Sequence, residues 1–459
     1  MADIIIWTSL STTPGIIRSV GAYAIKSWLV QHGYSVKVVD FCAKLTVEEI
    51  VQITERFLSD ETIAIGMSTT FLNLESSKKL LQAREIIESK NKTVKWVAGG
   101  YYASIGKYDA LKKWIQFAGL AEDSFLSWLD EQRWCKTIKR NLFDITTCRQ
   151  IWDDSDIILP GESLPMELGR GCKFKCKFCQ YPLIGKKPGT YIRNLDYVKE
   201  EMISNYERWG VTNYYFIDDT INEDDWKIQK IYEISQELPF QLQWVGFQRA
   251  DLIYSHPHQQ HWIKDSGCIG TFFGIESLHP EASKVVGKGW SAVHAKEFIP
   301  ELSHNIWKNK IGIQLSFIAG LPGEDRQSLE NTQQWCIDNK FNEWKFNPLF
   351  ISPSPLVWHS EFDRNFRQYG YEFKDPSDKS NWSNGMWTYL EAIDFTNELN
   401  KEARKVLSPG CWARNSLYKS IGREFKEEKY SDIDRTELGI TVSNLVKEYV
   451  KRSLEYPVY

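Results

Sequence analysis

Three cysteines stand close together in the middle of the chain, at Cys172, Cys176 and Cys179. Thiolates bind iron–sulfur clusters well, and a loop this short can place its sulfur atoms around one face of a cubane. A structural cluster normally has four cysteine ligands, so three leave one iron without a protein ligand, as an open position does on a catalytic zinc ion. The spacing therefore predicts a [4Fe–4S] cluster to which an external ligand can bind.

A zinc site and a chance group of thiols are the competing interpretations. Zinc requires a fourth ligand close by, and none of the eight histidines is near the motif in the sequence. We expect His256, His258 and His261, which begin a predicted helix, to be surface residues rather than a metal site. The other six cysteines are scattered, and we expect most of them to be small buried apolar residues. They are Cys42, Cys135, Cys148, Cys268, Cys336 and Cys411.

The cysteine motif follows a predicted strand that opens an alternating series of strands and helices. Six such units are too few for the usual eight-unit barrel, so we expect a partial barrel over residues 161–355, with its chemistry at the carboxyl ends of the strands. The predicted strands are 166–169, 214–218, 243–247, 271–275, 314–318 and 345–350. The predicted helices are near 194–209, 223–237, 257–266, 292–309 and 325–339.

Residues 1–135 also alternate between short apolar strands and helices, which predicts an α/β domain with a doubly wound parallel sheet. Ligands of such sheets bind beyond the carboxyl ends of the strands. Small residues at those ends, in 9–15, 68–70 and 99–100, would let a ligand approach the backbone closely. We expect 136–160 to be a linker and 356–459 to be a helical, aromatic-rich extension that caps the barrel or faces the substrate. The predicted strands are 4–7, 36–40, 63–68, 94–98 and 115–118, and the predicted helices are 16–32, 46–58, 74–90 and 105–113.

The Cys-x3-Cys-x2-Cys spacing, with Phe178 just before the last cysteine, resembles the radical S-adenosylmethionine (AdoMet) superfamily. In that family AdoMet chelates the open iron, and an electron from the cluster cleaves it to methionine and a 5′-deoxyadenosyl radical that abstracts hydrogen from substrate. Segments 216–220, 274–277, 287–289 and 317–324 also resemble this superfamily. Together they resemble its branch with an N-terminal cobalamin-binding domain.

The resemblance implies that Glu276 and Ser277 face AdoMet and that the backbone around 318–320 contacts adenine. Carboxylates and Ser suit the ribose diol and the ammonium group, and Arg suits the carboxylate. Helix capping is an alternative role for Asp218 or Asp219, and a salt bridge to a barrel neighbour is an alternative role for Glu276. The expected AdoMet-binding residues are Asp218, Arg249, Glu276, Ser277, Ile318 and Gly320.

Basic residues surround the cysteine motif, at Arg170, Lys173, Lys175 and Lys177. A cluster with three thiolates is anionic, so these cations would raise its reduction potential. The alternative is a solvated face that docks an acidic electron donor, such as a flavodoxin or a ferredoxin. The two interpretations have similar weight.

Cobalamin is the cofactor that the resemblance implies for the first domain, at Ser68, Thr69, Gly99 and Gly100. Methyltransferases of the cobalamin type carry a histidine that replaces the lower cobalt ligand, and the matching loop here, 9–15, contains none. We therefore expect cobalamin to bind without a protein ligand to cobalt. The alternative is a degenerate domain that serves as a scaffold.

These features predict a cobalamin-dependent radical AdoMet methyltransferase that acts at an unactivated carbon. Rearrangement or cyclisation is the alternative reaction, and an iron–sulfur electron carrier or redox sensor is the alternative without catalysis. The chain has 459 residues and a formal net charge of −4, which does not indicate nucleic-acid binding. Without a signal peptide or a long apolar run, we expect a cytoplasmic protein that does not enter a membrane. The substrate, a small molecule or a peptide, is not identified.

Overall fold

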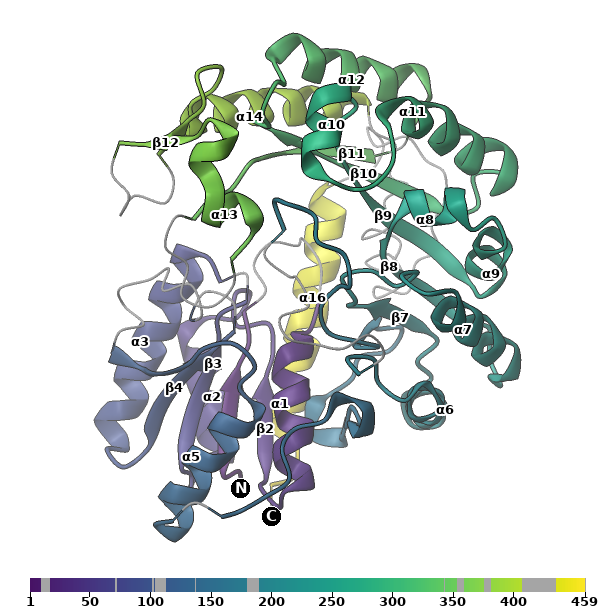
Figure 1. The fold of residues 1–459 in the computed structure, drawn as a ribbon. Helices are drawn as coiled ribbons and strands as arrows, with labels where there is room; N and C mark the ends of the chain where they lie inside the picture. Colours follow the sequence, from purple (N-terminus) through teal and green to yellow (C-terminus); the bar gives the residue numbers. More distant parts are fainter. Residues whose placement is uncertain are drawn as a thin grey trace.

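The computed structural model of the protein describes residues 1–9, 17–70, 72–100, 103, 113–136, 138–179, 190–341, 343–352, 359–374, 381–406 and 435–458. Two parallel sheets dominate these residues (Figure 1). Most of the loop expected at 9–15, most of the helix expected at 105–113, and Cys411 lie outside the described residues. Among the described helices, none combines the length and the apolar composition that crossing a membrane requires.

The first sheet is a doubly wound α/β unit, as predicted. In the described residues its strand order is β2-β1-β3-β4-β5, and every pair is parallel. Side chains alternate along β1, so Ile4 and Ile6 share a core with α1 and α5, whereas Ile5 and Trp7 share a core with α2 and α3. The strands are β1 Ile4–Trp7, β2 Val36–Val39, β3 Ala64–Ser68, β4 Lys95–Gly99 and β5 Ile115–Phe117. The helices are α1 Val20–Gln31, α2 Val47–Phe57, α3 Leu74–Lys90 and α5 Glu122–Trp134.

The second sheet has six parallel strands in the order β11-β10-β9-β8-β7-β6 within the described part of the chain. This is the predicted partial barrel, with helices covering its outer side (Figure 1). The strands are β6 Leu164–Met166, β7 Asn213–Phe216, β8 Gln243–Gln248, β9 Cys268–Glu276, β10 Gly312–Ala319 and β11 Glu343–Pro348. The helices are α6 Leu195–Trp209, α7 Asp225–Glu237, α8 Ala250–Ser255, α9 Gln259–Asp265, α10 Pro280–Val286, α11 Ala292–Pro300 and α12 Arg326–Asp338.

Most predicted elements of the barrel differ from the structure by a few residues at their ends, and two of the differences have a local physical cause. The first strand was expected at 166–169 but ends at Met166, because the N–H groups of Leu168 and Gly169 donate to the Asp218 carboxylate. The helix expected at 292–309 changes at Pro300 into a π-helical turn, Glu301–Ile306, since proline cannot donate the backbone hydrogen bond of a regular helix.

The segment expected to be a linker, 136–160, packs against the first domain over much of its length. It contains the 3₁₀ helices Ile145–Thr147 and Asp154–Asp156. The buried Arg18 guanidinium donates to the carbonyl oxygens of Asp156 and Ile157, at 2.8 and 2.9 Å, and pairs with Glu162. Lys26 pairs with the Asp156 carboxylate at 2.6 Å. Buried ion pairs thus hold this segment beside the sheet.

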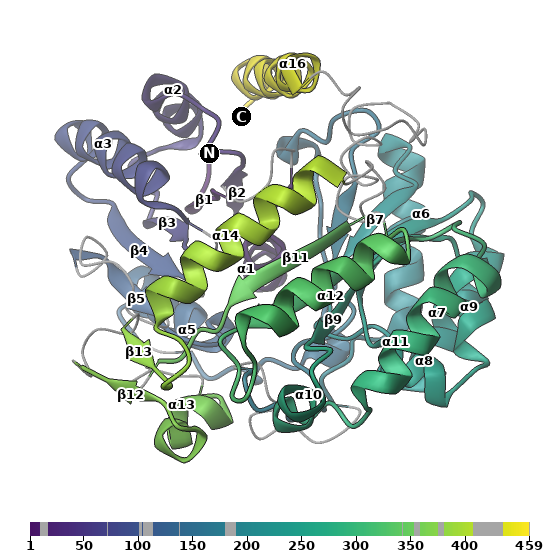
Figure 2. The same cartoon turned by 90° about the horizontal axis from the view of Figure 1, so that it is seen from above.

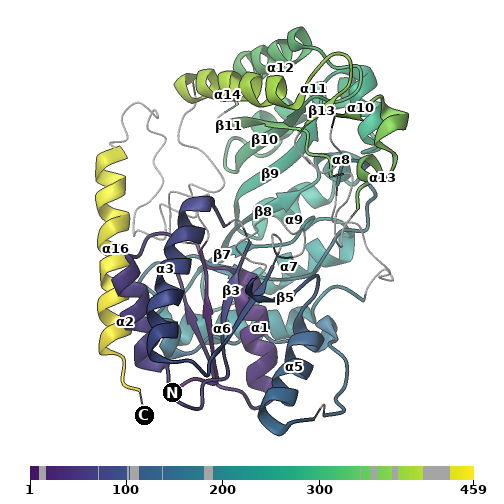
Figure 3. The ribbon, with the colours of Figure 1, turned by 90° about the vertical axis from the view of Figure 1, so that its left-hand side faces the viewer.

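The helical C-terminal part divides between the two sheets. Helix α14, Tyr389–Val406, lies along β11 and α12 (Figure 2). Helix α16, Arg435–Glu455, packs instead against α2 of the first domain (Figure 3). There the Asp40 N–H donates to the Tyr449 hydroxyl at 2.9 Å. Shorter elements join β11 to α14, namely α13 Glu361–Asn365, β12 Glu372–Phe373 and β13 Trp382–Ser383.

Candidate active site

The cysteine loop lies beyond the carboxyl end of β6 and is fixed by backbone hydrogen bonds. The Lys177 N–H donates to the carbonyl oxygen of Val286 at the end of α10, at 3.1 Å. The Lys177 carbonyl accepts from the N–H of Phe362 in α13, at 2.9 Å. The loop is therefore held between the barrel and the C-terminal part, and all three cysteines remain partly exposed.

Polar groups contact the sulfur atoms of Cys172 and Cys176. Thr220 Oγ1 lies 3.3 Å from Cys172 Sγ, and Arg249 Nη1 donates to Cys176 Sγ at 3.3 Å. The Thr220 hydroxyl donates to the Asp219 carbonyl at 2.7 Å, whereas the Arg249 guanidinium is a charged donor that stabilises the thiolate form required by a metal cluster. Burial raises the pKa of the Cys172 thiol, which the charge of a bound cluster would have to overcome.

The spacing of the sulfur atoms argues against a single zinc ion. Sulfur ligands of one tetrahedral zinc would lie about 3.8 Å apart. In the described residues, the three cysteines do not form a set of ligand atoms within 4.8 Å of one another. A cubane, which holds its cysteines on different irons, suits this wider arrangement.

Arg249 connects the cysteine loop with the end of β9. Its guanidinium lies 4.0 Å from the centre of the Phe174 ring and pairs with Asp251 at 2.6 Å. It also donates to the Lys288 carbonyl at 2.6 Å. Burial opposes its charge, but Asp251 and Cys176 outweigh burial and raise the pKa of Arg249. Arg249 therefore stays cationic beside the predicted cluster.

Glu276 ends β9 and forms an ion pair with Lys288, at 2.7 Å. The salt bridge that we expected as an alternative is thus present, and its partner lies in the segment 287–289 singled out from the sequence. Because the Lys288 carbonyl accepts from Arg249, the two predicted AdoMet-binding residues Arg249 and Glu276 lie around one lysine, close to Cys176. A role of Glu276 toward AdoMet stays a prediction.

Ser277 points inward, toward a buried carboxyl group. Its hydroxyl donates to Glu324 Oε1 at 2.5 Å, and the other oxygen, Oε2, is buried without a hydrogen-bond partner among the described residues. Burial raises the pKa of Glu324 to about 8, against the opposing effect of the Ser277 bond. Glu324 is therefore mostly protonated at neutral pH.

Glu324→Gln is expected to change how stability depends on pH. The pKa of Glu324 is about 8 in the folded chain, above the ordinary value of 4.5. Between these two values the folded state binds more protons than the unfolded state. The contribution of Glu324 to the free energy of unfolding is therefore greatest below about pH 4.5 and falls as pH rises toward 8. The difference between these two pKa values limits the pH-dependent loss of unfolding free energy to about 5 kcal/mol. Gln resembles the protonated carboxyl, so it should remove this loss.

Thermal unfolding of both proteins from pH 5 to pH 8 tests this expectation. The two should have similar melting temperatures at pH 5, and the variant should be more stable at pH 8. A constant difference across the range would contradict the raised pKa of Glu324.

Asp218 supports the backbone that leads to the cysteines. It is 2% exposed and accepts from the N–H groups of Leu168 and Gly169, at 2.9 and 3.1 Å. Its second oxygen pairs with Lys227 at 2.5 Å. Asp218 does not cap α7, because Asp224 occupies the N-cap position. The capping alternative is therefore wrong for Asp218, and these contacts give it a positioning role that the sequence did not indicate.

Gly320, at the end of β10, is covered by the C-terminal part of the chain. Its carbonyl accepts from the Tyr371 hydroxyl at 2.7 Å and from Asn384 Nδ2 at 3.1 Å. A Cβ atom here would lie 2.4 Å from Trp382 Cη2, and φ is +94°, so only glycine fits. Together with the buried Ile318, Gly320 is packed rather than open at the strand end. Its contact with adenine stays a prediction.

The basic residues of the cysteine motif have different surroundings. Lys173 forms an ion pair with Asp224, and Lys177 lies 5.4 Å from the centre of the Tyr369 ring. Lys175 is exposed. Arg170 forms ion pairs with Glu167 and Glu122. A solvated docking face would therefore depend mainly on Lys175.

A cavity of about 220 Å³ opens at the carboxyl ends of the first sheet, next to the point where the strand order reverses between β1 and β3. Its lining includes three of the predicted residues, Ser68, Gly99 and Gly100, with apolar residues from α1 and α5. Thr69 does not line it. The Thr69 hydroxyl instead donates to the Gly99 carbonyl at 2.8 Å and accepts from the Ala103 N–H at 2.9 Å.

Glycines give the cavity its width. A Cβ atom added to Gly21 would have no atom within 4 Å, and one added to Gly99 would meet only the Phe117 carbonyl, at 3.7 Å. Glu167 and Arg170 form the side of the cavity nearest the barrel. Because Arg170 is two residues before Cys172, the cavity and the cysteine loop share a wall.

Comparisons with known proteins agree with this geometry. Residues 166–336 match the family model of the Radical SAM superfamily. A 221-residue stretch is 26% identical to bacteriochlorophyllide d C-12(1)-methyltransferase of Chlorobaculum tepidum, covering 46% of this chain and 47% of that protein. The chain thus spans about half the length of the curated relatives it matches.

Two solved structures share the fold across both sheets. One is TsrM, a radical S-adenosylmethionine methyltransferase from Kitasatospora setae with cobalamin and a [4Fe–4S] cluster bound, with a TM-score of 0.63 and 13% identity over 99% of each chain. The other is OxsB, a cobalamin-dependent radical enzyme with aqua-cobalamin bound, with a TM-score of 0.56 and 15% identity over 72% of this chain and 51% of that one. At these identities the likeness shows a shared fold.

Proposed function

We propose that this chain, whose residues 166–336 form a radical SAM domain, is an enzyme that cleaves AdoMet reductively at a [4Fe–4S] cluster to form a 5′-deoxyadenosyl radical. We further propose that it uses cobalamin and transfers a methyl group to an unactivated carbon. The observation that carries the proposal is the loop with three cysteines at the carboxyl end of β6, next to a strand-end cavity.

The residues around the cysteine loop suit an anionic cluster and a zwitterionic partner. Arg249 presents its guanidinium to Cys176 and stays charged, so it would offset the negative charge of the cluster and thiolates. The Glu276–Lys288 pair provides both signs of charge for the amino and carboxylate groups of AdoMet. Trp382, Tyr371 and the packed strand end at Gly320 exclude water from one side.

The first domain suits cobalamin because its cavity lies at the strand ends and is lined in part by glycines. Cobalamin needs a broad face for the corrin ring and a slot for its nucleotide tail, and glycines at strand ends provide such a slot. When bound, cobalamin would supply the methyl group, and the cluster would supply the electron. Arg170, on the wall that both sites share, would lie near both groups and is held there by Glu122 and Glu167.

Anaerobic reconstitution with iron and sulfide, followed by dithionite and AdoMet, tests the proposal. The enzyme should release 5′-deoxyadenosine and methionine, whereas an electron carrier or a redox sensor should release neither. Loading with hydroxocobalamin in the same experiment should give about one cobalt per chain. A reconstituted protein that never forms 5′-deoxyadenosine would contradict the proposed cleavage.

Glu276→Ala is expected to weaken AdoMet cleavage and leave the cluster in place. Loss of a charge-assisted hydrogen bond costs about 1.5–3 kcal/mol, or roughly 10- to 150-fold in affinity or rate. Bound iron and AdoMet affinity are the measurements. Lys288→Ala and the double variant complete a cycle. If Glu276 served only as the partner of Lys288, the double variant would be no worse than Lys288→Ala alone.

A further inference from the structure

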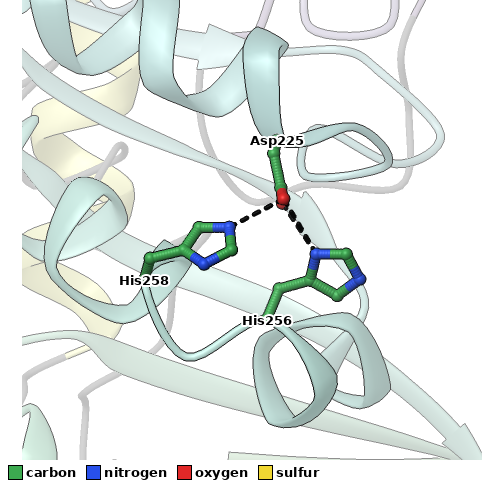
Figure 4. Close-up of side chains that lie close together, drawn as sticks. All are labelled: Asp225, His256 and His258. Carbon is green, nitrogen blue, oxygen red and sulfur yellow. Dashed lines mark hydrogen bonds and ion pairs between the residues drawn. The ribbon is translucent and has the colours of Figure 1, made fainter.

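Two histidines and an aspartate meet on the surface of the barrel. Asp225 is the first residue of α7, His256 follows α8, and His258 precedes α9. Figure 4 shows both imidazole rings directed at the single carboxylate of Asp225. Three helices thus bring three potential metal ligands to one point. We call these three residues the His–Asp cluster.

The distances in the His–Asp cluster are close to those of a metal site. His256 Nδ1 lies 2.9 Å and His258 Nε2 lies 2.7 Å from Asp225 Oδ2. The three ligand atoms lie within 4.8 Å of one another. Nitrogen and oxygen ligands of a tetrahedral zinc ion, each about 2.0–2.2 Å from the metal, are about 3.4 Å apart. A side-chain movement of roughly half an ångström would admit the ion.

A second set of contacts orients the carboxylate and one ring. Gln259 Nε2 donates to Asp225 Oδ1 at 2.7 Å, and the Gln259 side chain is itself buried and held by Asn222 Nδ2 at 2.9 Å. The His258 ring lies edge-on to Trp262, with 4.8 Å between centres. Hydrogen bonds behind the ligands are typical of metal sites, because they fix the direction of the ligand atoms. This support distinguishes the cluster from three independent surface residues.

We propose that Asp225, His256 and His258 bind one Zn²⁺ ion, with water completing the coordination. Two imidazoles and one carboxylate are a ligand set that zinc takes in proteins. The side chains of His256, His258 and Asp225 are 43%, 44% and 36% exposed, so the ion has a path from solvent. This proposal revises the expectation that the histidines are surface residues without a metal, and it does not rest on the proposed function.

The ion would connect the start of α7 with the turn between α8 and α9. The residue before Asp225, Asp224, forms the ion pair with Lys173 of the cysteine loop. Arg249, which donates to Cys176, immediately precedes α8. Bound zinc would therefore stabilise the positions of Asp224 and Arg249, two residues that contact the cysteine loop. It would be a structural site separate from the proposed catalytic one.

Calorimetric titration of Zn²⁺ into the full-length protein with its iron–sulfur cluster reconstituted tests the proposal. The variants are His256→Gln and His258→Gln, since Gln can still donate to Asp225 but is a poor zinc ligand. His261→Gln is the matched control, because His261 lies in the same segment but outside the cluster, against Trp262. Cluster content and thermal unfolding without zinc check that each variant is folded.

We expect wild type and His261→Gln to bind one Zn²⁺ per chain and to melt at a higher temperature with zinc. His256→Gln and His258→Gln should bind at least tenfold more weakly and should lose the zinc-dependent rise, while their melting temperatures without zinc stay near wild type. If wild type bound no zinc, or if all variants bound it equally, the His–Asp cluster would be a hydrogen-bonded surface group and the proposal would be wrong.

Discussion

Replacing Cys172, Cys176 or Cys179 by Ala is expected to remove the iron–sulfur cluster and AdoMet cleavage together. The cluster has only three protein ligands in this proposal, so the loss of one leaves two thiolates for four irons. Iron bound after anaerobic reconstitution should fall from about four per chain to near zero. Formation of 5′-deoxyadenosine should fall to the background level, because in this proposal the cluster delivers the electron.

Cys336→Ala is the matched control for these variants. Cys336 is fully buried in α12, far from the loop in sequence, and packs within the core of the barrel. Its loss should lower stability by a modest amount but keep both the iron content and the cleavage. Selective loss of the cluster in a folded Cys336→Ala protein would mean that the assignment of ligands is wrong.

Gly21→Leu is expected to expel cobalamin without harming the fold. Gly21 is in the first turn of α1 and lines the cavity, and its Cβ position is open. A leucine side chain would occupy the slot that the nucleotide tail needs, and bound cobalt should fall from about one per chain to less than a tenth of that. Leucine also favours helix over glycine by up to about 1 kcal/mol, so stability should not drop.

Gly21→Leu is a better test than a change at Gly100. Gly100 has φ +99°, and a Cβ atom there would lie 2.9 Å from Thr70 Oγ1, so any side chain would strain the backbone as well as fill the cavity. Gln31→Leu, on the exposed end of α1 outside the cavity, is the control and should retain cobalt. Full cobalt loading of Gly21→Leu would show that the corrinoid binds elsewhere.

The pattern of the sequence was sufficient to predict both sheets, because parallel strands buried on both faces are short apolar runs between amphipathic helices. Strand ends were less predictable. At β6, Leu168 and Gly169 continue the apolar pattern, yet their N–H groups bond to Asp218, and this side-chain contact ends the strand. Helices α8 and α10 were missed because they have only six and seven residues, too few to show a period. Helix α5, with 13 residues, was also missed, because no helix was expected after the last predicted strand of the first domain.

The cysteine motif can be recognised in the sequence because its spacing is local, whereas the groups around it come from distant segments. Arg249 reaches Cys176 across 73 residues of sequence, and Ser277 meets Glu324 across 47. Thr69 illustrates a different limit of the sequence, although its role toward cobalamin stays a prediction. It stands at a strand end, as a ligand-binding residue would, but its hydroxyl satisfies backbone groups of the next loop. Sequence position indicates which end of a sheet a residue occupies, but not which way its side chain turns.

The packing of α16 against the first domain has a consequence for synthesis of the chain. Val442, Val446 and Val450 share a core with β1 and α2, and the hydrogen bond from Asp40 to Tyr449 joins residues 409 positions apart. At about 5–20 residues per second, a ribosome needs roughly 20–80 seconds to make the intervening chain. During that time the outer face of α2 lacks its partner and exposes apolar side chains. Residues 1–135 are therefore made long before their core is complete, and the nascent chain should depend on chaperones until α16 has left the ribosome.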